Sequence, residues 1–338
     1  FPTISVTANL PGAEAQRLYK LVRGVADRGI AVLFVSHHFD EVFEMADSVT
    51  VLRDAKHIIT RPVEGLTEEE LIELVVGRKL DEHVTDADAR EHGEAVLEIK
   101  GVSGASVQDL NITIHAGEVV GFAGITGSGR EEVASLIFGG HNRAGQVFLQ
   151  GQELPECRPD VSIDRGIALV PAERHANASL MDQTLRENIT IVNPGHHMNF
   201  GFLRRSSERS DVNEWLDKLD VRPRNSEYTM AQLSGGNQQK VVIARWMRQE
   251  PKVLILDEPT QGVDVGAKAD IHRLVDEAAA QGTAVMVAST DHEELVRVCD
   301  RVIIMRRGKA VDVLKGSKLT NDNITAASIG RDTGEPAA

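Results

Sequence analysis

Residues 124–132, GITGSGREE, have the glycine spacing of a phosphate-binding loop, for which the pattern is G-x-x-x-x-G-K-[ST]. Arg130 and Glu131 stand at the lysine and hydroxyl positions of that pattern. Arginine keeps the positive charge but is bulkier and presents a planar fork. Glu131 removes a hydroxyl ligand of Mg²⁺, although a carboxylate also binds this ion, so Glu131 is itself a candidate metal ligand. The other residues expected around a phosphate are Gly124, Gly127, Ser128 and Gly129.

A second glycine motif, LSGGNQQK, lies at residues 233–240. Ser234 is a residue type that caps helix N-termini, and helix-forming residues follow the two glycines. A helix N-terminus offers free N–H groups and the positive end of a dipole, which suits a phosphate. Taken alone, the motif favours a phosphate site over a capped helix that merely follows Ser-Gly-Gly.

Two acids end an apolar run further along the chain. Asp257 closes the run VLILD, and Glu258 follows it. An acid at the C-terminal end of a buried parallel strand can hold Mg²⁺ through water, and its neighbour can activate a water for attack on a phosphate. An isolated strand ending in Asp-Glu is more often structural. The order of glycine loop, LSGGNQQK and Asp-Glu favours nucleotide chemistry.

Strand-like and helix-like runs alternate around these motifs. Apolar runs at 118–124, 252–259 and 283–290 are typical of buried strands, whereas 131–139 and 267–282 have helical spacing. This alternation predicts an α/β fold in which helices cover a parallel sheet.

An internal repeat organises the chain. Residues 35–54 align with 288–307 at an offset of 253 positions, so that Ser36 falls on Ser289, and the register continues without gaps to Gly330-Arg331. The repeat predicts the tail of one unit at 1–80, an acidic linker at 81–95, a second unit at 96–331 and a loose tail at 332–338.

Composition excludes several classes of function. The formal charge of −14 argues against binding to nucleic acid, which needs clustered Lys and Arg. The sequence contains no run of about 18 apolar residues, so it predicts no membrane-spanning helix. Cys157 and Cys299 match no metal spacing and are expected to be reduced thiols. The pair His196 and His197 is expected to be solvated and not to bind a metal.

The three motifs resemble those of the ABC-transporter ATPases. The glycine loop resembles their Walker A motif, LSGGNQQK their signature, LILDEPT their Walker B motif and GVDVGAK, with Asp264, their D-loop. LSGGNQQK, GxGR and SHHFDEVFEMAD are similar to the twin-cassette ATP-binding subunits of bacterial sugar importers of the ribose, galactose and xylose type. This resemblance covers about 12–331. It implies a P-loop cassette with a parallel-sheet core, a small antiparallel β subdomain and a helical subdomain, preceded by the C-terminal part of a first cassette.

The resemblance also implies cofactors, partners and roles. The cofactors would be ATP and Mg²⁺, with Asp257 holding the metal through water and Glu258 and His37 acting in catalysis. The signature residues that would contact nucleotide are Ser234, Gly235, Gly236 and Gln238. The partners would be membrane permease subunits and, indirectly, a periplasmic sugar-binding protein, at the cytoplasmic face of the inner membrane. In this family two cassettes face each other, so a second cassette, either the protein's own other half or another copy, would complete each site.

Several positions depart from the family pattern. The repeat places Thr290 where the first unit has the switch histidine His37, and Ala172 stands where other cassettes carry the Q-loop glutamine. His292 lies two residues out of register and is expected on the surface. The second cassette's own site is therefore predicted to be weak. The register also places 4–6 where the second unit has 257–259, so the chain is expected to begin after the Walker B motif of the first cassette.

Three functions compete. The first is the ATP-hydrolysing subunit that energises monosaccharide import through a separate permease. The second is a non-hydrolysing nucleotide-binding fragment or regulatory module with a degenerate Walker A motif. The third, a soluble ABC protein of translation or DNA repair, is disfavoured by the acidic charge.

Overall fold

The computed structural model describes residues 12–36, 39–53, 56–77, 92–199 and 201–330, which divide into two compact units. The first unit comprises Phe1–Glu82 with Asp264–Ala269, and the second comprises His83–Val263 with Asp270–Ala338. The first boundary lies close to the predicted end of the first repeat at 80.

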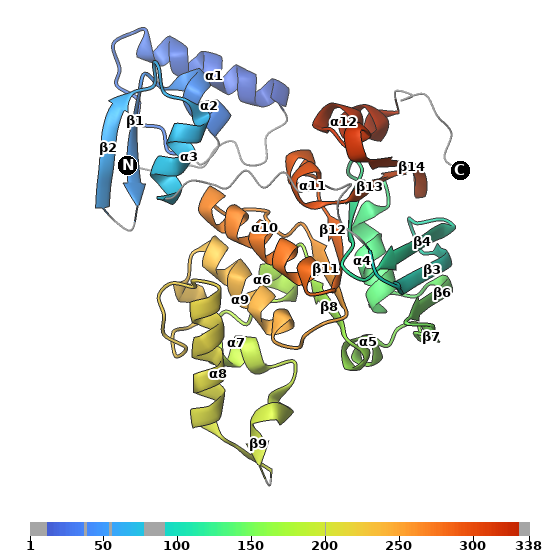
Figure 1. The fold of residues 1–338 in the computed structure, drawn as a ribbon. Coiled ribbons are helices and arrows are strands. Elements are labelled where there is room, and N and C mark those ends of the chain that lie inside the picture. Colours follow the sequence, from blue (N-terminus) through green and yellow to red (C-terminus); the bar gives the residue numbers. More distant parts are fainter. Residues whose placement is uncertain (1–11, 37–38, 54–55, 78–91, 200, 331–338) are drawn as a thin grey trace. The chain divides into compact units, whose positions relative to one another are not determined.

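A six-stranded sheet forms the centre of the second unit (Figure 1). In spatial order its strands are β14 (Lys309–Lys315), β13 (Arg301–Arg306), β5 (Val119–Ala123), β12 (Ala284–Ala288), β11 (Val253–Asp257) and β8 (Ile167–Val170). All neighbours pair in parallel except β14, which is antiparallel to β13. Strands β5 and β12 are buried at every residue, as expected of strands covered on both faces. The predicted parallel sheet is thereby confirmed.

A second, antiparallel sheet has the order β4 (Leu110–His115), β3 (Ala95–Ser103), β6 (Ala144–Leu149) and β7 (Gln152–Glu153). Buried and exposed residues alternate along most of β4, which is typical of a sheet that covers a core on one side only. Its apolar side chains join those of the larger sheet and of α4 (Arg130–Phe138) in one hydrophobic core. This is the small β subdomain that the family resemblance implies.

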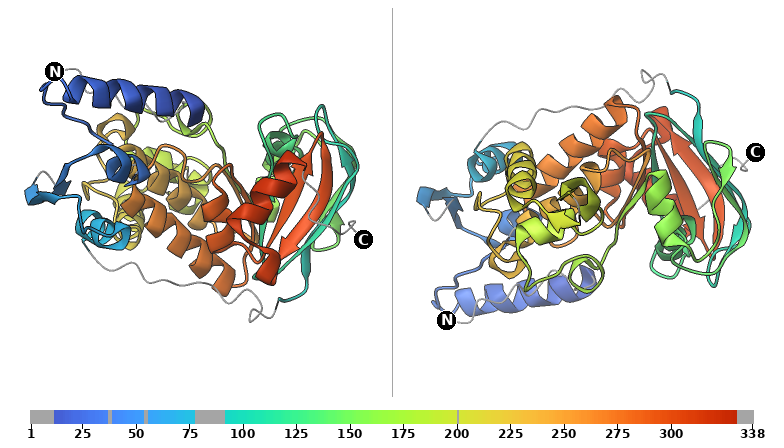
Figure 2. Two further views of the ribbon diagram at one scale, coloured as in Figure 1. Left: turned by 90° about the horizontal axis from the view of Figure 1, so that it is seen from above. Right: turned by 90° about the horizontal axis from the view of Figure 1, so that it is seen from below.

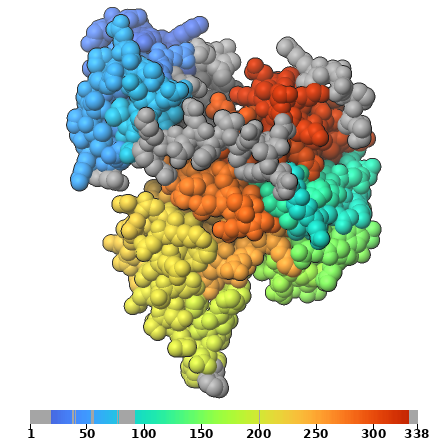
Figure 3. Space-filling model, in the orientation of Figure 1, coloured from blue at the N-terminus to red at the C-terminus, as the bar shows by residue number. Residues whose placement is uncertain are grey.

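Helices complete the second unit. They are α5 (Pro159–Arg165), α6 (Arg174–Asn177), α7 (Leu185–Thr190), α8 (Arg205–Lys218), α9 (Gly235–Met247), α10 (Val265–Ala280), α11 (His292–Val298) and α12 (Asn321–Ile329), with 3₁₀ turns at Pro194–His197, Met230–Gln232 and Gly316–Lys318. The first residues of α10, up to Ala269, are assigned to the first unit. Helices α7, α8 and α9 pack on one another and, with the short hairpin of β9 (Met198–Asn199) and β10 (Phe202–Leu203), form a helical subdomain. In Figure 3 this subdomain, in yellow and yellow-green, extends beyond the sheet-containing part of its unit. Among the described residues, no helix has the length and apolar character that crossing a membrane requires.

The first unit contains α1 (Gly12–Ala26), α2 (Phe39–Met45), the antiparallel hairpin β1 (Ser48–Arg53) with β2 (Lys56–Pro62), and α3 (Glu68–Val76). The last four elements correspond, bound for bound, to α11, β13, β14 and α12 at the offset of 253 positions, as from Phe39 to His292. The strand irregularity between Val51 and Leu52 also recurs between Ile304 and Met305. The structure therefore repeats where the sequence does. Figure 2 shows the elements of both units from two further directions.

Candidate nucleotide site

The glycine loop connects β5 to α4 in a conformation that depends on its glycines. A Cβ atom at Gly124 would lie 2.6 Å from the carbonyl oxygen of Met305, and Gly129 has φ +97° at the N-cap of α4. A side chain at either position would force the loop to move or strain it. The loop therefore folds as a phosphate-binding loop does, with a helix N-terminus directly behind it.

Arg130, at the first position of α4, points to the Walker B acids. Its Nη2 lies 2.9 Å from Oε1 of Glu258, and the two side chains are 4% and 11% exposed. The Nε and Nη1 atoms of Arg130 are buried without a hydrogen-bond partner among the described residues. The Coulombic attraction within an ion pair so far removed from water is stronger than in a surface pair, but burial also costs hydration. The two orphaned nitrogens leave the guanidinium only partly satisfied.

Thr290 holds the other side of the Glu258 carboxylate. Its backbone N–H donates to Oε1 at 3.0 Å and its hydroxyl donates to Oε2 at 3.1 Å. Glu258 has φ +46°, a left-handed conformation that is uncommon for a residue with a side chain and often found at functional sites. The residue at the switch-histidine position therefore binds the glutamate that was predicted to be catalytic.

Asp257 lies at the C-terminal end of β11, as predicted. The pKa of Asp257 is raised to about 6, chiefly by burial of the carboxyl group. The nearby charge of Arg130 lowers this pKa, whereas the charge of Glu258 raises it. The backbone N–H of Ala172 also donates to Asp257, which favours the ionised form. The Q-loop position thus acts through its backbone, because alanine has no side-chain amide to offer.

Glu131 turns back into the loop. Its Oε1 accepts a hydrogen bond of 2.9 Å from the backbone N–H of Gly127. Oriented in this way, the carboxylate binds a loop amide, and its predicted role as a metal ligand stays a prediction. Ser128 is buried, and its Oγ lies 3.4 Å from the backbone nitrogen of Arg130.

The residues present fit a phosphate better than they fit Mg²⁺. The glycine cradle and the two orphaned nitrogens of Arg130 are suited to an anion. For Mg²⁺ the hydroxyl ligand is missing and Glu131 is engaged by Gly127, which leaves Asp257 as the principal ligand. Among the described residues, no group of three or more His, Cys, Asp or Glu side chains could hold a metal ion.

The signature motif begins α9. Ser234 is the N-cap residue, as predicted, but its hydroxyl makes no cap bond and accepts instead from Nδ2 of Asn237 at 2.9 Å. A Cβ atom at Gly235 would lie 3.0 Å from the carbonyl oxygen of Gly262, so the chains approach closely here. Gly236 is buried, whereas Ser234 is exposed and can meet a ligand.

Gln238 differs from its predicted role as a nucleotide contact. It is only 4% exposed, its Nε2 donates to the carbonyl oxygen of Leu233 at 3.1 Å, and its Oε1 lies 2.9 Å from Nε2 of His175. One helical turn beyond Gly235, this side chain faces the inside of the subdomain. Its amide therefore holds the signature loop in place.

Arg174 makes structural contacts that no sequence pattern predicts. Its Nη1 donates to the carbonyl oxygen of Gln261 at 2.8 Å, directly after the Walker B segment, and burial lowers its pKa. With His175 it connects α6 to both the Walker B region and α9. No local pattern marks these contacts, because the partners are about 60 to 90 positions away.

The structure does not test the predicted roles of two further residues, Asp264 in nucleotide binding and His37 in catalysis. Asp264 accepts from the N–H of Ala267 at 2.9 Å, a bond that caps the start of α10. His37 lies outside the described residues.

The expectation of two solvated histidines is confirmed for His196, which is exposed, and is wrong for His197. His197 is buried, and its Nε2 lies 3.0 Å from Asp211, which also pairs with Arg248. His292 is partly buried, with Nδ1 2.9 Å from the hydroxyl of Thr325, and burial lowers its pKa. His197 and His292 meet partners that are distant in sequence, so neither loop composition nor repeat register indicated their burial.

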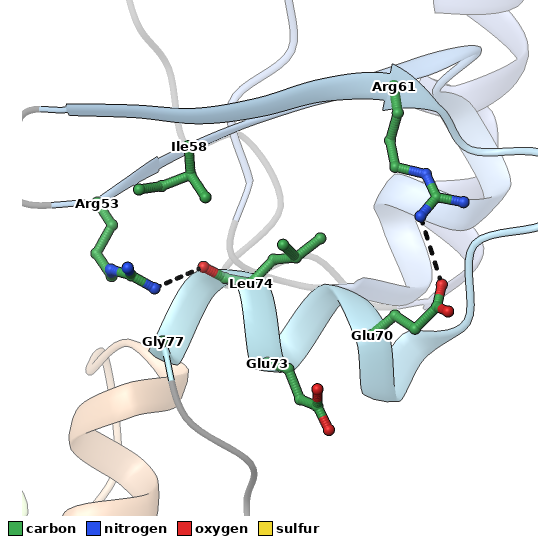
Figure 4. A pocket seen from close by; sticks show the side chains of 7 residues that line it. All are labelled: Arg53, Ile58, Arg61, Glu70, Glu73, Leu74 and Gly77. Atoms are coloured by element: carbon green, nitrogen blue, oxygen red, sulfur yellow. Dashed lines mark hydrogen bonds and ion pairs between the residues drawn. The ribbon is translucent and has the colours of Figure 1, made fainter.

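Two hollows in the molecule lie away from these motifs. One, of 460 Å³, lies in the first unit between the β1–β2 hairpin and α3, where Arg53 donates to the carbonyl oxygen of Leu74 and Arg61 pairs with Glu70 (Figure 4). The other, of 920 Å³, lies in the second unit between the β6–β7 turn, α5 and the residues after α9. Neither is lined by a residue of the glycine loop, the signature or the Walker B segment.

The parallel sheet, the glycine loop at the start of α4 and the signature at the start of α9 define an ATP-binding cassette. Residues 107–261 match the family model described as ABC transporter. The chain is 40% identical to a ribose import ATP-binding protein of Streptomyces coelicolor over 327 residues, and 40% identical to one of Rhodococcus jostii over 326. These alignments cover 96% of this chain and 65% of each relative. Residues 107–261 thus have the sequence of an ABC transporter cassette, and the chain spans less than two thirds of the length of these curated relatives.

Solved structures agree on the fold. A nucleotide-free ATP-binding cassette from an ABC transporter matches 72% of this chain, and 100% of its own, with a TM-score of 0.59 at 21% identity. A dimeric cassette in a post-hydrolysis state, bound to ADP and phosphate, matches 65% of this chain with a TM-score of 0.56 at 23% identity. The predicted fold class is therefore confirmed for the second unit.

Proposed function

We propose that this chain is part of the ATP-hydrolysing subunit that energises import of a monosaccharide through separate membrane permease subunits. Its similarity to ribose import ATP-binding proteins supports this role. The subunit would lie at the cytoplasmic face of the inner membrane, where closure of two cassettes around ATP moves the permease. A periplasmic binding protein would deliver the sugar to that permease.

Within this subunit, the second cassette (residues 96–331) is the half with low ATPase activity, called the weak half below. The observation that carries this conclusion is the Glu258 carboxylate, held by Arg130 at 2.9 Å and by two donors of Thr290. A general base needs a free lone pair aimed at the attacking water, and the oxygens of this carboxylate are already occupied by three donors. Bound ATP would supply the scissile phosphate, with Asp257 nearest to any Mg²⁺. The cassette therefore binds nucleotide loosely and hydrolyses it slowly or not at all.

The signature of this cassette serves a different site. Ser234 and the glycines that follow it present the N-terminus of α9, whose thirteen residues give a full helix dipole. In a pair of facing cassettes, these residues complete the phosphate site of the first cassette. The weak half would then contribute to turnover without hydrolysing ATP itself.

Residues 1–80 are proposed to be the C-terminal part of that first cassette. The repeat of α2, β1, β2 and α3 supports this assignment. Residues 31–35 correspond to buried strand β12 but form no strand, and Leu33 is 91% exposed. A run of apolar residues with strand propensity stays exposed only where a covering element is missing. Further strands of the first cassette would cover it.

A non-hydrolysing nucleotide-binding or regulatory module is the second candidate, because the Arg130–Glu258 pair is present in this chain whatever its partner. Phosphate release from Mg-ATP by the purified chain, beside its Glu258→Gln variant, separates the possibilities. We expect no release that depends on Glu258. Release that Glu258→Gln abolishes would overturn the assignment of a weak half.

The role of the signature is tested in the full-length protein with both cassettes. Ser234→Arg places a bulky cation at the helix N-terminus, and we expect it to abolish ATP turnover. The matched control is Ser206→Arg, the same change at an exposed position of α8, which should leave turnover intact. Unchanged turnover in Ser234→Arg would refute the signature's role. Co-purification of permease subunits with the full-length protein distinguishes an importer from the regulatory module.

A further inference from the structure

The first turn of α4 contains two glutamates, Glu131 and Glu132, that bind different backbone N–H groups. Glu132 binds the backbone N–H groups of Ala105 at 2.8 Å and Ser106 at 2.6 Å, and so fixes the loop before β4. Glu131 is exposed and binds the N–H of Gly127, inside the phosphate loop itself. Only Glu131 therefore places a carboxylate where the loop would receive a phosphate oxygen.

The Glu131 carboxylate accepts a hydrogen bond from the loop as a bound phosphate would. Backbone N–H groups of a glycine loop before a helix bind anions, and a carboxylate is an anion of suitable size. Gly127 has φ +81°, the left-handed conformation that anion-binding turns of successive backbone N–H groups use. The loop amide that a phosphate would use already has an acceptor.

Arg130 shows that the loop still requires an anion. Its side chain is 4% exposed, and Nε and Nη1 are buried without a partner among the described residues. Buried guanidinium nitrogens without acceptors are costly, and a phosphate oxygen would satisfy them. The cation and the adjacent carboxylate thus have opposite effects on phosphate binding.

We propose that the Glu131 carboxylate is a built-in competitor of nucleotide phosphates, which occupies the loop from within and lowers its affinity for nucleoside di- and triphosphates. This inference rests on the proposed function, since it names the residue that makes the site weak. Glu131→Gln keeps the shape and the acceptor but removes the charge. Glu131→Thr removes the carboxylate and restores the hydroxyl of the usual loop.

The experiment measures ADP and ATP binding to the whole chain by equilibrium dialysis, with EDTA and with Mg²⁺. With EDTA, we expect both variants to bind about tenfold more tightly than the wild-type chain, since an exposed like charge is partly screened. The gain should shrink at high salt, and Mg²⁺ should tighten binding further only for Glu131→Thr. Glu69→Gln, the same change in the first turn of the nine-residue helix α3, is the control and should leave affinity unchanged.

Each outcome is decisive. Equal affinities of wild type and Glu131→Gln in EDTA would refute the competitor, whether or not the site is weak. Binding that survives Arg130→Met in a folded chain, judged by circular dichroism, would place the nucleotide elsewhere and also refute it. Tight binding of Mg-ATP by the wild type, with Glu258-dependent release of phosphate, would instead refute the proposed function.

Discussion

The Arg130–Glu258 ion pair should couple the phosphate loop to the Walker B segment energetically. Removing one partner of a buried ion pair costs about 3–5 kcal/mol, because the other charge is left without compensation. Arg130→Met leaves Glu258 with the two donors of Thr290 and 11% exposure, so part of that cost is avoided. We expect the free energy of unfolding to fall by about 2–3 kcal/mol.

The reciprocal change has a similar effect. Glu258→Gln removes the paired carboxylate from a guanidinium that is 4% exposed, and two of its nitrogens already lack partners among the described residues. Asp257 then remains as the nearby acid that interacts with Arg130. The double variant Arg130→Met/Glu258→Gln removes both charges and should unfold within about 1 kcal/mol of the wild type, since replacing a whole buried pair is often neutral. The coupling energy should therefore be about 3 kcal/mol or more.

Urea unfolding followed by tryptophan fluorescence measures these values. Both tryptophans, Trp215 and Trp246, lie in the second unit, so the signal reports on the unit that holds the pair. The exposed pair Arg273–Glu277, 2.8 Å apart, is the control and should couple by less than about 0.5 kcal/mol. Additivity of the Arg130 and Glu258 changes within about 0.5 kcal/mol would refute the reasoning.

Three further predictions concern stability. Since burial raises the pKa of Asp257 from 3.8 to about 6, its ionisation opposes folding as the pH rises; Asp257→Asn should stabilise the chain by about 3 kcal/mol at pH 7 and by less than about 1 kcal/mol at pH 4, measured by urea unfolding at each pH. Gly124→Ala should lower the melting temperature markedly because its Cβ atom meets backbone, whereas Gly127→Ala, in open space at φ +81°, should cost only about 1 kcal/mol; equal losses in thermal denaturation would contradict this contrast. Arg186→Met should destabilise the helical subdomain by about 3 kcal/mol, since it leaves Glu208, paired at 2.8 Å and buried, without its cation; an unchanged urea midpoint would show that the pair contributes nothing.

The arrangement of the sheet could be predicted because strand burial leaves a local signal. The apolar run ending in Asp257 and the run at 283–290 became the neighbouring strands β11 and β12. The repeat was also readable, since the offset that aligns Ser36 with Ser289 aligns the structural elements as well. Apolar spacing depends on residues close together in the chain, and a repeat is found by aligning the sequence with itself, so neither requires knowledge of contacts between distant residues.

The orientation of polar side chains was harder to predict. Gln238 turns inward because His175, 63 positions earlier, and the carbonyl oxygens of its own loop bind its amide. His197 is buried because Asp211 and Arg248 surround it. Such partners meet only after the subdomain has folded, so motif spacing predicts which residues lie at a site and not which atoms they bind.

The substitutions at the nucleotide site form an interdependent set. Arg130 has the reach to pair with Glu258, and Thr290 is small enough to donate to the same carboxylate from the other side. A histidine at 290 would have to share that carboxylate with the guanidinium, and a lysine at 130 would give up the planar fork. Restoring one residue therefore leaves a partner adapted to the present arrangement. Glu131 is the exception, because its bond to Gly127 lies within the loop and involves neither acid of the Walker B segment.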